Sequence, residues 1–158
     1  MLMRNSNKLL FILCTISFIS NNLYSEDSKK MPKEIISTDN APQAIGPYSQ
    51  AVKTGNLIFI SGQIPLDPKT GEKVDGSIED QANQVLKNIQ SICEAAGHGL
   101  EDIVKITIFL TDLGNFATVN EVMKSYFKEP YPARATVEIS ALPLGVNVEI
   151  EAIVSTNG

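Results

Sequence analysis

The last third of the chain holds two runs in which apolar and polar residues alternate. Residues 132–139 form the first run, residues 142–145 carry turn-forming proline and glycine, and residues 146–153 form the second. Side chains on a β-strand point alternately to its two faces, so each run predicts a strand. In the second run the apolar residues share one face, and they are Val146, Val148, Ile150 and Ala152. The polar residues share the other face, and they are Asn147, Glu149 and Glu151.

These two runs also carry charges that suggest chemistry. Arg134 stands near the start of the first run, two residues after Pro132, and Glu149 and Glu151 stand on the polar face of the second. A fixed cation and a carboxylate that are close in sequence can bind a small anion and transfer a proton. A solvated sheet face with unrelated charges is the competing interpretation, and the residues alone favour it.

Two segments between these runs and the N-terminus have helical periodicity. The first helix begins after a capping Ser77 and ends at Gly97. Its apolar stripe contains Ile78, Ala82, Val85, Leu86, Ile89, Ile92, Cys93 and Ala96. Its opposite face is predicted to meet water, and that face contains Gln81, Asn83, Gln84, Lys87 and Gln90. The second helix begins at a capping Asp112 or Asn115, and its stripe contains Phe116, Val119, Val122, Met123, Tyr126 and Phe127.

Further strands are predicted before and between the helices. Residues 34–37 suit a short edge strand, and a turn at residues 55–56 leads into an apolar run at residues 57–64 that suits a central strand. Residues 103–110 alternate, with one face formed by Val104, Ile106, Ile108 and Leu110 and the other by Lys105 and Thr107. The order of elements predicts a two-layer α+β domain with a mixed sheet and two helices on one face. The other face must be solvated or shared with another subunit.

The N-terminus has the order of a secretory signal peptide. Residues 1–8 are basic, residues 9–19 are apolar, and Ser25 precedes a charged stretch. The apolar run is too short to span a bilayer. We therefore expect a signal peptide at 1–25, a flexible tether at 26–33 and the folded domain at 34–158, in a protein exported to a periplasm or secreted. An organelle-targeting leader, an uncleaved anchor and a cytosolic location are the alternatives.

Composition restricts the function further. Cleavage after Ser25 would remove Arg4 and Lys8 from the 13 basic residues and none of the 18 acidic ones, leaving a net charge of −7. An acidic chain gains no electrostatic affinity for a phosphate backbone, so nucleic acid is not expected as a partner. Only Cys93 would remain, inside a helical pattern, as a buried inert thiol. With His98 as the only histidine, neither a histidine-based triad nor a multi-histidine metal site is expected.

Five collinear segments resemble the Rid family of reactive intermediate deaminases, also called YjgF-like. The resemblance runs from about residue 35 to residue 154 and is strongest to the RidA branch, the 2-iminobutanoate/2-iminopropanoate deaminases. The segments are residues 45–51 (IGPYSQA), 60–65 (ISGQIP), 112–120 (DLGNFATVN), 132–134 (PAR) and 148–152 (VEIEA).

This resemblance implies a chorismate-mutase-like fold and a homotrimer with active sites between subunits. It also implies hydrolysis of reactive 2-imino or enamine acids to 2-oxo acids and ammonia, without a cofactor or metal. Neither nucleic acid nor, after leader cleavage, a membrane is implied as a partner. A binding module that captures small carboxylates without turnover is the alternative, and an endoribonuclease is a weaker one.

The resemblance also assigns roles to individual residues. Arg134 would hold the substrate carboxylate, and Glu149 would position or activate the attacking water. The pocket would be lined by Tyr48, Ser61 and Asn120, with backbone from Gly62. Many relatives have a cysteine two residues after the arginine, whereas this chain has Thr136 in the predicted substrate site. A mechanism that needs a thiol at that position is therefore excluded for this chain.

Overall fold

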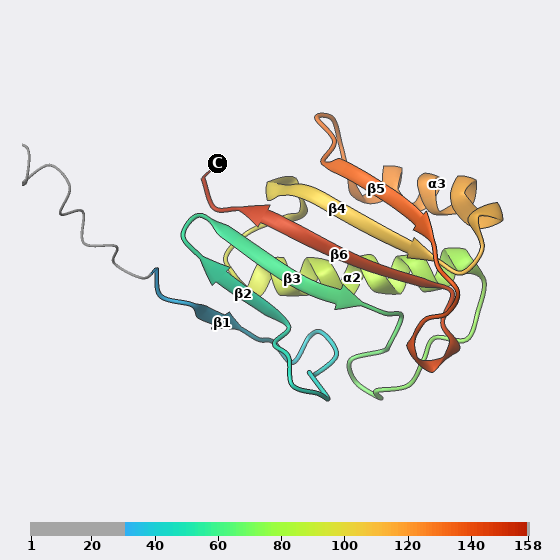
Figure 1. The fold of residues 1–158 in the computed structure, drawn as a ribbon, viewed down its shortest axis with the longest axis horizontal. Helices are drawn as coiled ribbons and strands as arrows, with labels where there is room; N and C mark the ends of the chain where they lie inside the picture. Colours follow the sequence, from blue (N-terminus) through green and yellow to red (C-terminus); the bar gives the residue numbers. More distant parts are fainter. Residues whose placement is uncertain (1–30, 158) are drawn as a thin grey trace, which may run out of the picture. The chain divides into compact units, whose positions relative to one another are not determined.

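A computed structural model describes residues 31–157 of the chain, in which two helices cover one face of a six-stranded sheet (Figure 1). The mixed sheet and the two helices confirm the predicted α+β fold class. The predicted signal peptide lies outside the described residues, as does most of the predicted tether. Between residues 31 and 157, neither helix has the length and apolar character that crossing a membrane requires.

The sheet has the strand order β1-β2-β3-β6-β4-β5. Neighbouring strands are antiparallel except β4 and β5, which run parallel. The long β6 therefore lies in the middle of the sheet, and β5 forms an edge (Figure 1). The strands are β1 (Glu34–Ile36), β2 (Ala51–Thr54), β3 (Leu57–Gln63), β4 (Ile103–Leu110), β5 (Ala133–Glu138) and β6 (Val148–Ser155).

The predicted turn before β3 is confirmed, and a bulge corrects the predicted faces of β4. The predicted hairpin turn joins β2 to β3, and Gly55 adopts a φ of 57° there, which glycine does at no steric cost. In β4, however, Val104 is exposed and Ile103 is buried, the reverse of the predicted alternation. The pairing of β4 with β6 shifts between Ile103 and Lys105, and this extra residue changes which face the first residues present.

Helix α2 (Ile78–Ala95) begins and ends close to where the sequence predicts. The Ser77 hydroxyl accepts a hydrogen bond from the backbone N–H of Asp80, and the Asp80 carboxylate accepts one from the N–H of Ser77, so the pair forms a capping box. Gly97 follows the helix with a φ of 79°. The prediction for Gln81 is wrong: it is only 5% exposed, because its Oε1 accepts a hydrogen bond from the Asn147 N–H at 2.9 Å.

Helix α3 (Phe116–Tyr126) is the shorter of the two helices that cover the sheet. Asn115 precedes it without a side-chain capping bond, whereas Asp112 accepts a hydrogen bond from the Gly114 N–H and caps the short 3₁₀ turn η2 (Leu113–Asn115). Phe116 was predicted to join the apolar stripe, but it is 42% exposed at the first turn of the helix. Its ring lies against Arg134, one of the predicted site residues.

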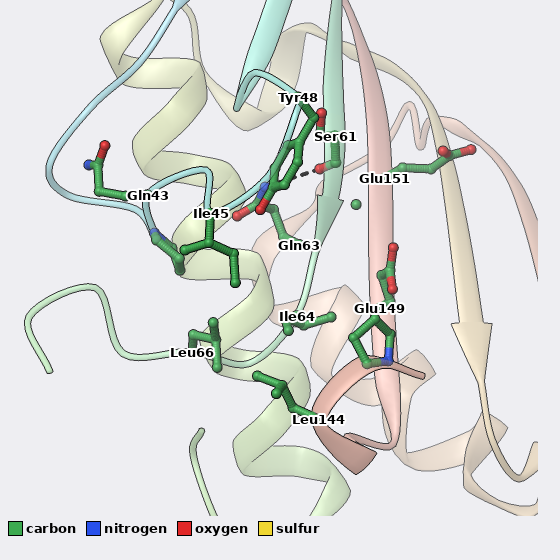
Figure 2. A pocket seen from close by; sticks show the side chains of 13 residues that line it. Gln43, Ile45, Tyr48, Ser61, Gln63, Ile64, Leu66, Leu144, Glu149 and Glu151 are labelled. Atoms are coloured by element: carbon green, nitrogen blue, oxygen red, sulfur yellow. Dashed lines mark hydrogen bonds between the residues drawn. The ribbon is translucent and has the colours of Figure 1, made fainter. Parts of the chain in front are cut away.

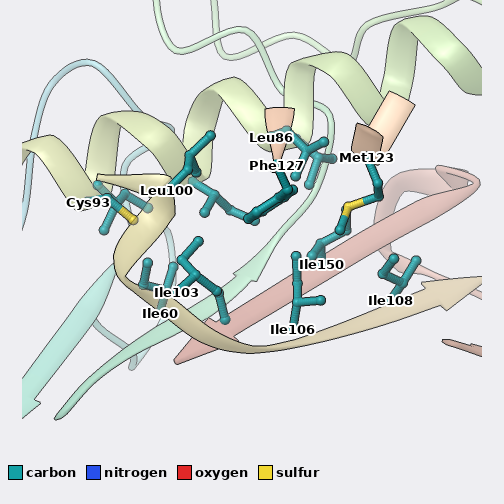
Figure 3. Packing of buried hydrophobic residues seen from close by; sticks show 14 of the residues in the cluster. Ile60, Leu86, Cys93, Leu100, Ile103, Ile106, Ile108, Met123, Phe127 and Ile150 are labelled. Atoms are coloured by element: carbon teal, nitrogen blue, oxygen red, sulfur yellow. The ribbon is translucent and has the colours of Figure 1, made fainter. Parts of the chain in front are cut away.

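The hydrophobic core lies between the helices and the sheet (Figure 3). Apolar residues of both helical stripes pack on the predicted apolar faces of β4 and β6, including the fully buried Ile106, Ile108 and Ile150. Cys93 lies in this core, and burial raises the pKa of its thiol to about 12. Its predicted burial is therefore confirmed, and a protonated thiol is chemically inert at neutral pH.

The face of the sheet that the helices leave open carries both predicted polar residues and apolar ones. Glu149 and Glu151 lie on it together with Lys105 and Thr107, as strand pairing between β4 and β6 requires. Phe59 of β3 and Val137 of β5 are exposed in the single chain and belong to the same face by their strand registers. Large exposed apolar residues on a sheet face are typical of a surface that another chain covers.

Candidate active site

The seven residues that the sequence singles out fall into two groups. Tyr48, Ser61, Gly62 and Glu149 line a pocket of about 610 Å³ on the open side of the sheet (Figure 2). The remaining three, at the β5 edge, do not line this pocket, and they are Asn120, Arg134 and Thr136.

Glu149 and Gly62 determine each other's position in the pocket. Gly62 lies in β3 and Glu149 in the adjacent β6, where the register shifts between Ile60 and Gln63. A Cβ atom added to Gly62 would collide with the Glu149 carboxylate. The carboxylate therefore lies directly against the Gly62 backbone, and it would have to move if this residue had a side chain.

The Glu149 carboxyl group has an altered acidity. Burial raises its pKa above the ordinary value, and the negative charge of Glu151 raises it further. Both carboxylates line the same pocket. A raised carboxyl pKa brings the group closer to neutral pH, where proton transfer by a general base is most effective.

Two hydroxyl-bearing residues complete the polar end of the pocket. The Ser61 hydroxyl donates a hydrogen bond to the Ser49 carbonyl at 2.6 Å, so its lone pairs remain able to accept a bond from a ligand. Tyr48 is 51% exposed and stands beside Ser61 at the pocket rim (Figure 2). Its ring lies against Gly46, where an added Cβ would make van der Waals contact with it.

Buried amide side chains hold the loops that form this pocket. Gln50 donates to the carbonyls of Ala41 and Pro42 at 3.2 and 2.8 Å, which fixes the loop before β2. Asn88 of α2 donates to the carbonyls of Ile64 and Leu66 at 3.3 and 3.0 Å, which fixes the loop after β3. A buried amide costs free energy unless it is bonded, so these two residues tie the pocket walls to the core.

Arg134 is held at the β5 edge by helix α3. Its Nη1 donates to Asn120 Oδ1 at 2.8 Å, and its guanidinium carbon lies 5.4 Å from the centre of the Phe116 ring. Stacking on an aromatic face and one hydrogen bond restrict the orientation of the planar group. Arg134 is the only arginine after Arg4 and forms no ion pair within residues 31–157, so its other donors can take an anion.

Thr136 lies on the same strand face as Arg134, two residues further along β5. Its hydroxyl oxygen is shielded from solvent and has no hydrogen-bond partner in the described part of the chain. A shielded hydroxyl without a partner is costly in a folded protein, so a ligand or another chain is a reasonable source of that partner.

Arg134 and Glu149 belong to opposite faces of the sheet. Arg134 is paired with Ile106, which is buried beneath the helices, whereas Glu149 is paired with Phe109 on the open face. One chain therefore does not bring the two charges into a single pocket, although they are close in sequence. If they act together, as the sequence predicts, each must come from a different copy of the chain.

Several residues that support the site were not assigned to it from the sequence. Phe116 precedes Asn120 by four positions on α3, and this spacing places both on one side of a helix. That spacing could have identified Phe116 as a second contact of Arg134. For Gln50 and Asn88 the sequence offers no comparable signal, because polar residues in a pattern are assumed to face water.

Comparison with known proteins identifies the class. The family described as Endoribonuclease L-PSP, which includes the YjgF and Rid proteins, matches residues 38–156. The chain belongs to this family. It is 60% identical over 121 residues to a RutC family protein of Pyrococcus horikoshii, which covers 77% of this chain and 96% of that relative.

Two further similarities concern a named enzyme and a solved structure. A 2-iminobutanoate/2-iminopropanoate deaminase of Mus musculus is 50% identical over 121 residues, covering 77% of this chain and 90% of that enzyme. A crystal structure of Escherichia coli TdcF with bound serine is 49% identical and covers 77% of this chain and 98% of that one, with a TM-score of 0.74. The predicted family and its fold are thereby confirmed, and relatives named as deaminases support enzymatic activity.

No group of three or more histidine, cysteine, aspartate or glutamate residues in the described part of the chain is arranged to hold a metal ion.

Proposed function

We propose that the protein hydrolyses reactive 2-imino acids, and their enamine tautomers, to 2-oxo acids and ammonia. 2-Iminobutanoate and 2-iminopropanoate are the proposed substrates, as the name of the mouse relative suggests for that enzyme. The observation that carries the proposal is the Glu149 carboxylate, seated against Gly62 in a pocket and raised in pKa by burial and by Glu151.

The reaction needs little beyond orientation and one proton-transfer group. The imine carbon is already electrophilic, so a water oxygen held by Glu149 can form a bond to it while Glu149 takes a proton from that water. The π electrons of the C=N bond pass to nitrogen, which takes up the proton held by Glu149. The C–N bond of the resulting adduct then breaks as its hydroxyl group gives up a proton to the nitrogen, so the nitrogen leaves as ammonia and the carbon becomes the carbonyl of the 2-oxo acid. No cofactor is required by this sequence of steps.

Arg134 is proposed to hold the substrate carboxylate. A guanidinium can donate two parallel hydrogen bonds to a carboxylate, which fixes the angle of the substrate as well as its position. Asn120 and Phe116 restrict the guanidinium from α3, so they would act through Arg134. The serine in the related TdcF structure supports a small ligand with an amino-acid carboxylate.

A homotrimer is proposed because the site is divided between two faces of the sheet. In a ring of three copies, the Arg134 edge of one chain can meet the Glu149 pocket of the next, which generates three equivalent sites. The exposed Phe59 and Val137 on the open face support burial of that face against another copy. Multi-angle light scattering should give about three times the subunit mass, and a stable, active monomer would contradict the proposal.

Turnover distinguishes this proposal from a binding module. Imines should be generated in the assay by an amino-acid oxidase, and formation of 2-oxo acid should be compared with the spontaneous rate. Acceleration that disappears with Arg134→Ala supports the deaminase. Binding of a stable 2-oxo acid without any acceleration would instead support a carboxylate-binding module. The family name Endoribonuclease L-PSP makes nuclease activity the other alternative to test, and the net negative charge of the chain gives it little attraction for phosphate.

The location of the protein remains a separate proposal. Residues 1–25 have the order of a signal peptide, so we propose cleavage after Ser25 and export to a periplasm or secretion. N-terminal sequencing of protein purified from its host should find Glu26 or a near neighbour first. An intact Met1 on soluble cytoplasmic protein would contradict export.

A further inference from the structure

Leu144 has a backbone conformation that leucine rarely adopts. Its φ is 57° and its ψ is 13°, and Gly145 follows with a φ of 65°. The two residues form the centre of a tight turn, closed by a hydrogen bond from the Val146 N–H to the Pro143 carbonyl at 3.3 Å. For glycine this conformation is free, whereas an L-residue with a Cβ is disfavoured there.

Burial in the core does not explain this leucine. The Leu144 side chain is 62% exposed, so the described fold gains little from its apolar atoms. Asparagine or glycine would form the same turn with less strain and expose less apolar surface. Strained residues of this kind concentrate at sites where the side chain has a use in binding or catalysis.

The position of Leu144 provides that use. It lines the same pocket as Glu149, and Figure 2 shows it near Ile64 and Leu66 at one end of the pocket, while Ser61 and Tyr48 lie at the other. The pocket therefore has a polar end suited to charged and hydrogen-bonding groups and an aliphatic end suited to an apolar group. Glu149 lies beside the region between the two ends (Figure 2).

We propose that Leu144 is a specificity-determining residue whose side chain contacts the apolar side chain of the 2-imino acid. It would favour branched aliphatic substrates, such as the imine derived from leucine, over the imine derived from alanine. This inference rests on the proposed deaminase function and adds the side-chain preference of the same pocket. Ile64 and Leu66, which Asn88 holds in place through their carbonyls, would form the opposing wall.

The expected size of the effect follows from apolar contacts in other pockets. One methylene more or less in a hydrophobic pocket changes the specificity ratio by about 10- to 200-fold. Leu144 is one of several aliphatic residues and remains largely exposed in the single chain. Removing the Leu144 side chain should therefore change the ratio of kcat/KM for the leucine-derived and alanine-derived imines by about tenfold, at the low end of this range.

The test compares two variants that suit the turn with a matched control. Leu144→Asn and Leu144→Gly both tolerate the left-handed conformation, so their unfolding temperatures should equal or exceed that of the parent. Leu113→Asn replaces another exposed leucine in a short 3₁₀ turn that does not line the pocket. The kcat/KM of each protein is measured with imines derived from alanine and from leucine, formed in situ.

The inference predicts that the parent prefers the leucine-derived imine and that both Leu144 variants lose this preference while still hydrolysing the alanine-derived imine. Leu113→Asn should retain the parent ratio. An unchanged ratio in folded Leu144 variants, or a parent without the preference, would overturn the role of Leu144. A parent that accelerates the hydrolysis of neither imine would instead overturn the proposed function, so the two failures are distinguishable.

Discussion

Replacing Gly62 with alanine should impair activity without unfolding the protein. The added Cβ would occupy the space of the Glu149 carboxylate, so either this side chain or the β3 backbone must move. The backbone of Gly62 is not in the left-handed region, and alanine can adopt it without dihedral strain. Displacement of the proposed base is therefore the main consequence.

The magnitude can be worked out from this displacement. Relief of the collision requires a movement of about 1 Å, and a misplacement of that size in a catalytic group can cost about 100-fold in rate. This loss corresponds to about 2.7 kcal/mol of transition-state stabilisation. The free energy of unfolding should change by less than about 1 kcal/mol. Alanine lowers the conformational entropy of the unfolded chain, which favours folding, and Glu149 can rotate toward solvent to relieve the collision.

A double-mutant cycle separates this explanation from general damage to the pocket. Imine hydrolysis and urea unfolding are measured for the parent, Gly62→Ala, Glu149→Gln and the double variant. If Gly62 acts through Glu149, the double variant should be no slower than Glu149→Gln alone. Full activity of Gly62→Ala would refute the close packing of the two residues. If the two losses in activation free energy add fully in the double variant, the effect of Gly62 on activity does not depend on Glu149.

Two further predictions concern the charged residues. Arg134→Lys keeps the charge but removes the planar fork, so imine hydrolysis should fall by about 100-fold; parental kcat/KM would contradict the bidentate anchor. Glu149→Gln should lower turnover while 2-oxo acid binding persists. Because burial and Glu151 raise the Glu149 pKa in the folded state, ionisation destabilises the parent. Urea unfolding should therefore show the variant gaining stability over the parent as the pH rises through that pKa, with no difference in acid.

Much of the fold follows from local patterns that the sequence displays. The α2 boundaries depend on a capping serine and a terminal glycine, and the apolar face of β6 follows from strict alternation between Val148 and Val154. These signals depend on neighbouring residues only. Val104 lies on the opposite face from the predicted one because the pairing of β4 with β6 contains a bulge. The sequence of β4 carries no signal for this bulge.

The arrangement of the site was less predictable, for a reason of geometry. Alternation places residues on faces within one strand, but it cannot connect the faces of β5 and β6 across the turn at residues 139–147. Arg134 takes its face from parallel pairing with β4, whereas Glu149 takes its face from antiparallel pairing with β4 and β3. The division of the candidate site between two faces therefore depends on long-range pairing.

Polar residues with structural tasks were also missed. Gln81 belongs to the polar side of the α2 pattern, yet it is buried because its amide oxygen meets the backbone N–H of Asn147. Hydrophobic periodicity counts such a residue as solvent-facing. The same limitation applies to Asn88, which holds the loop at one wall of the pocket.

The central claim is that each active site takes Arg134 from one copy of the chain and Glu149 from another. Arg134→Ala and Glu149→Gln variants, each nearly inactive alone, can be co-expressed with different tags and purified as mixed oligomers. In a trimer that contains both variants, one of the three sites combines an intact Arg134 with an intact Glu149, which is about one third. The account predicts recovery of about one third of the parental imine hydrolysis in the mixed oligomers. Mixed oligomers no more active than the separate variants would contradict it.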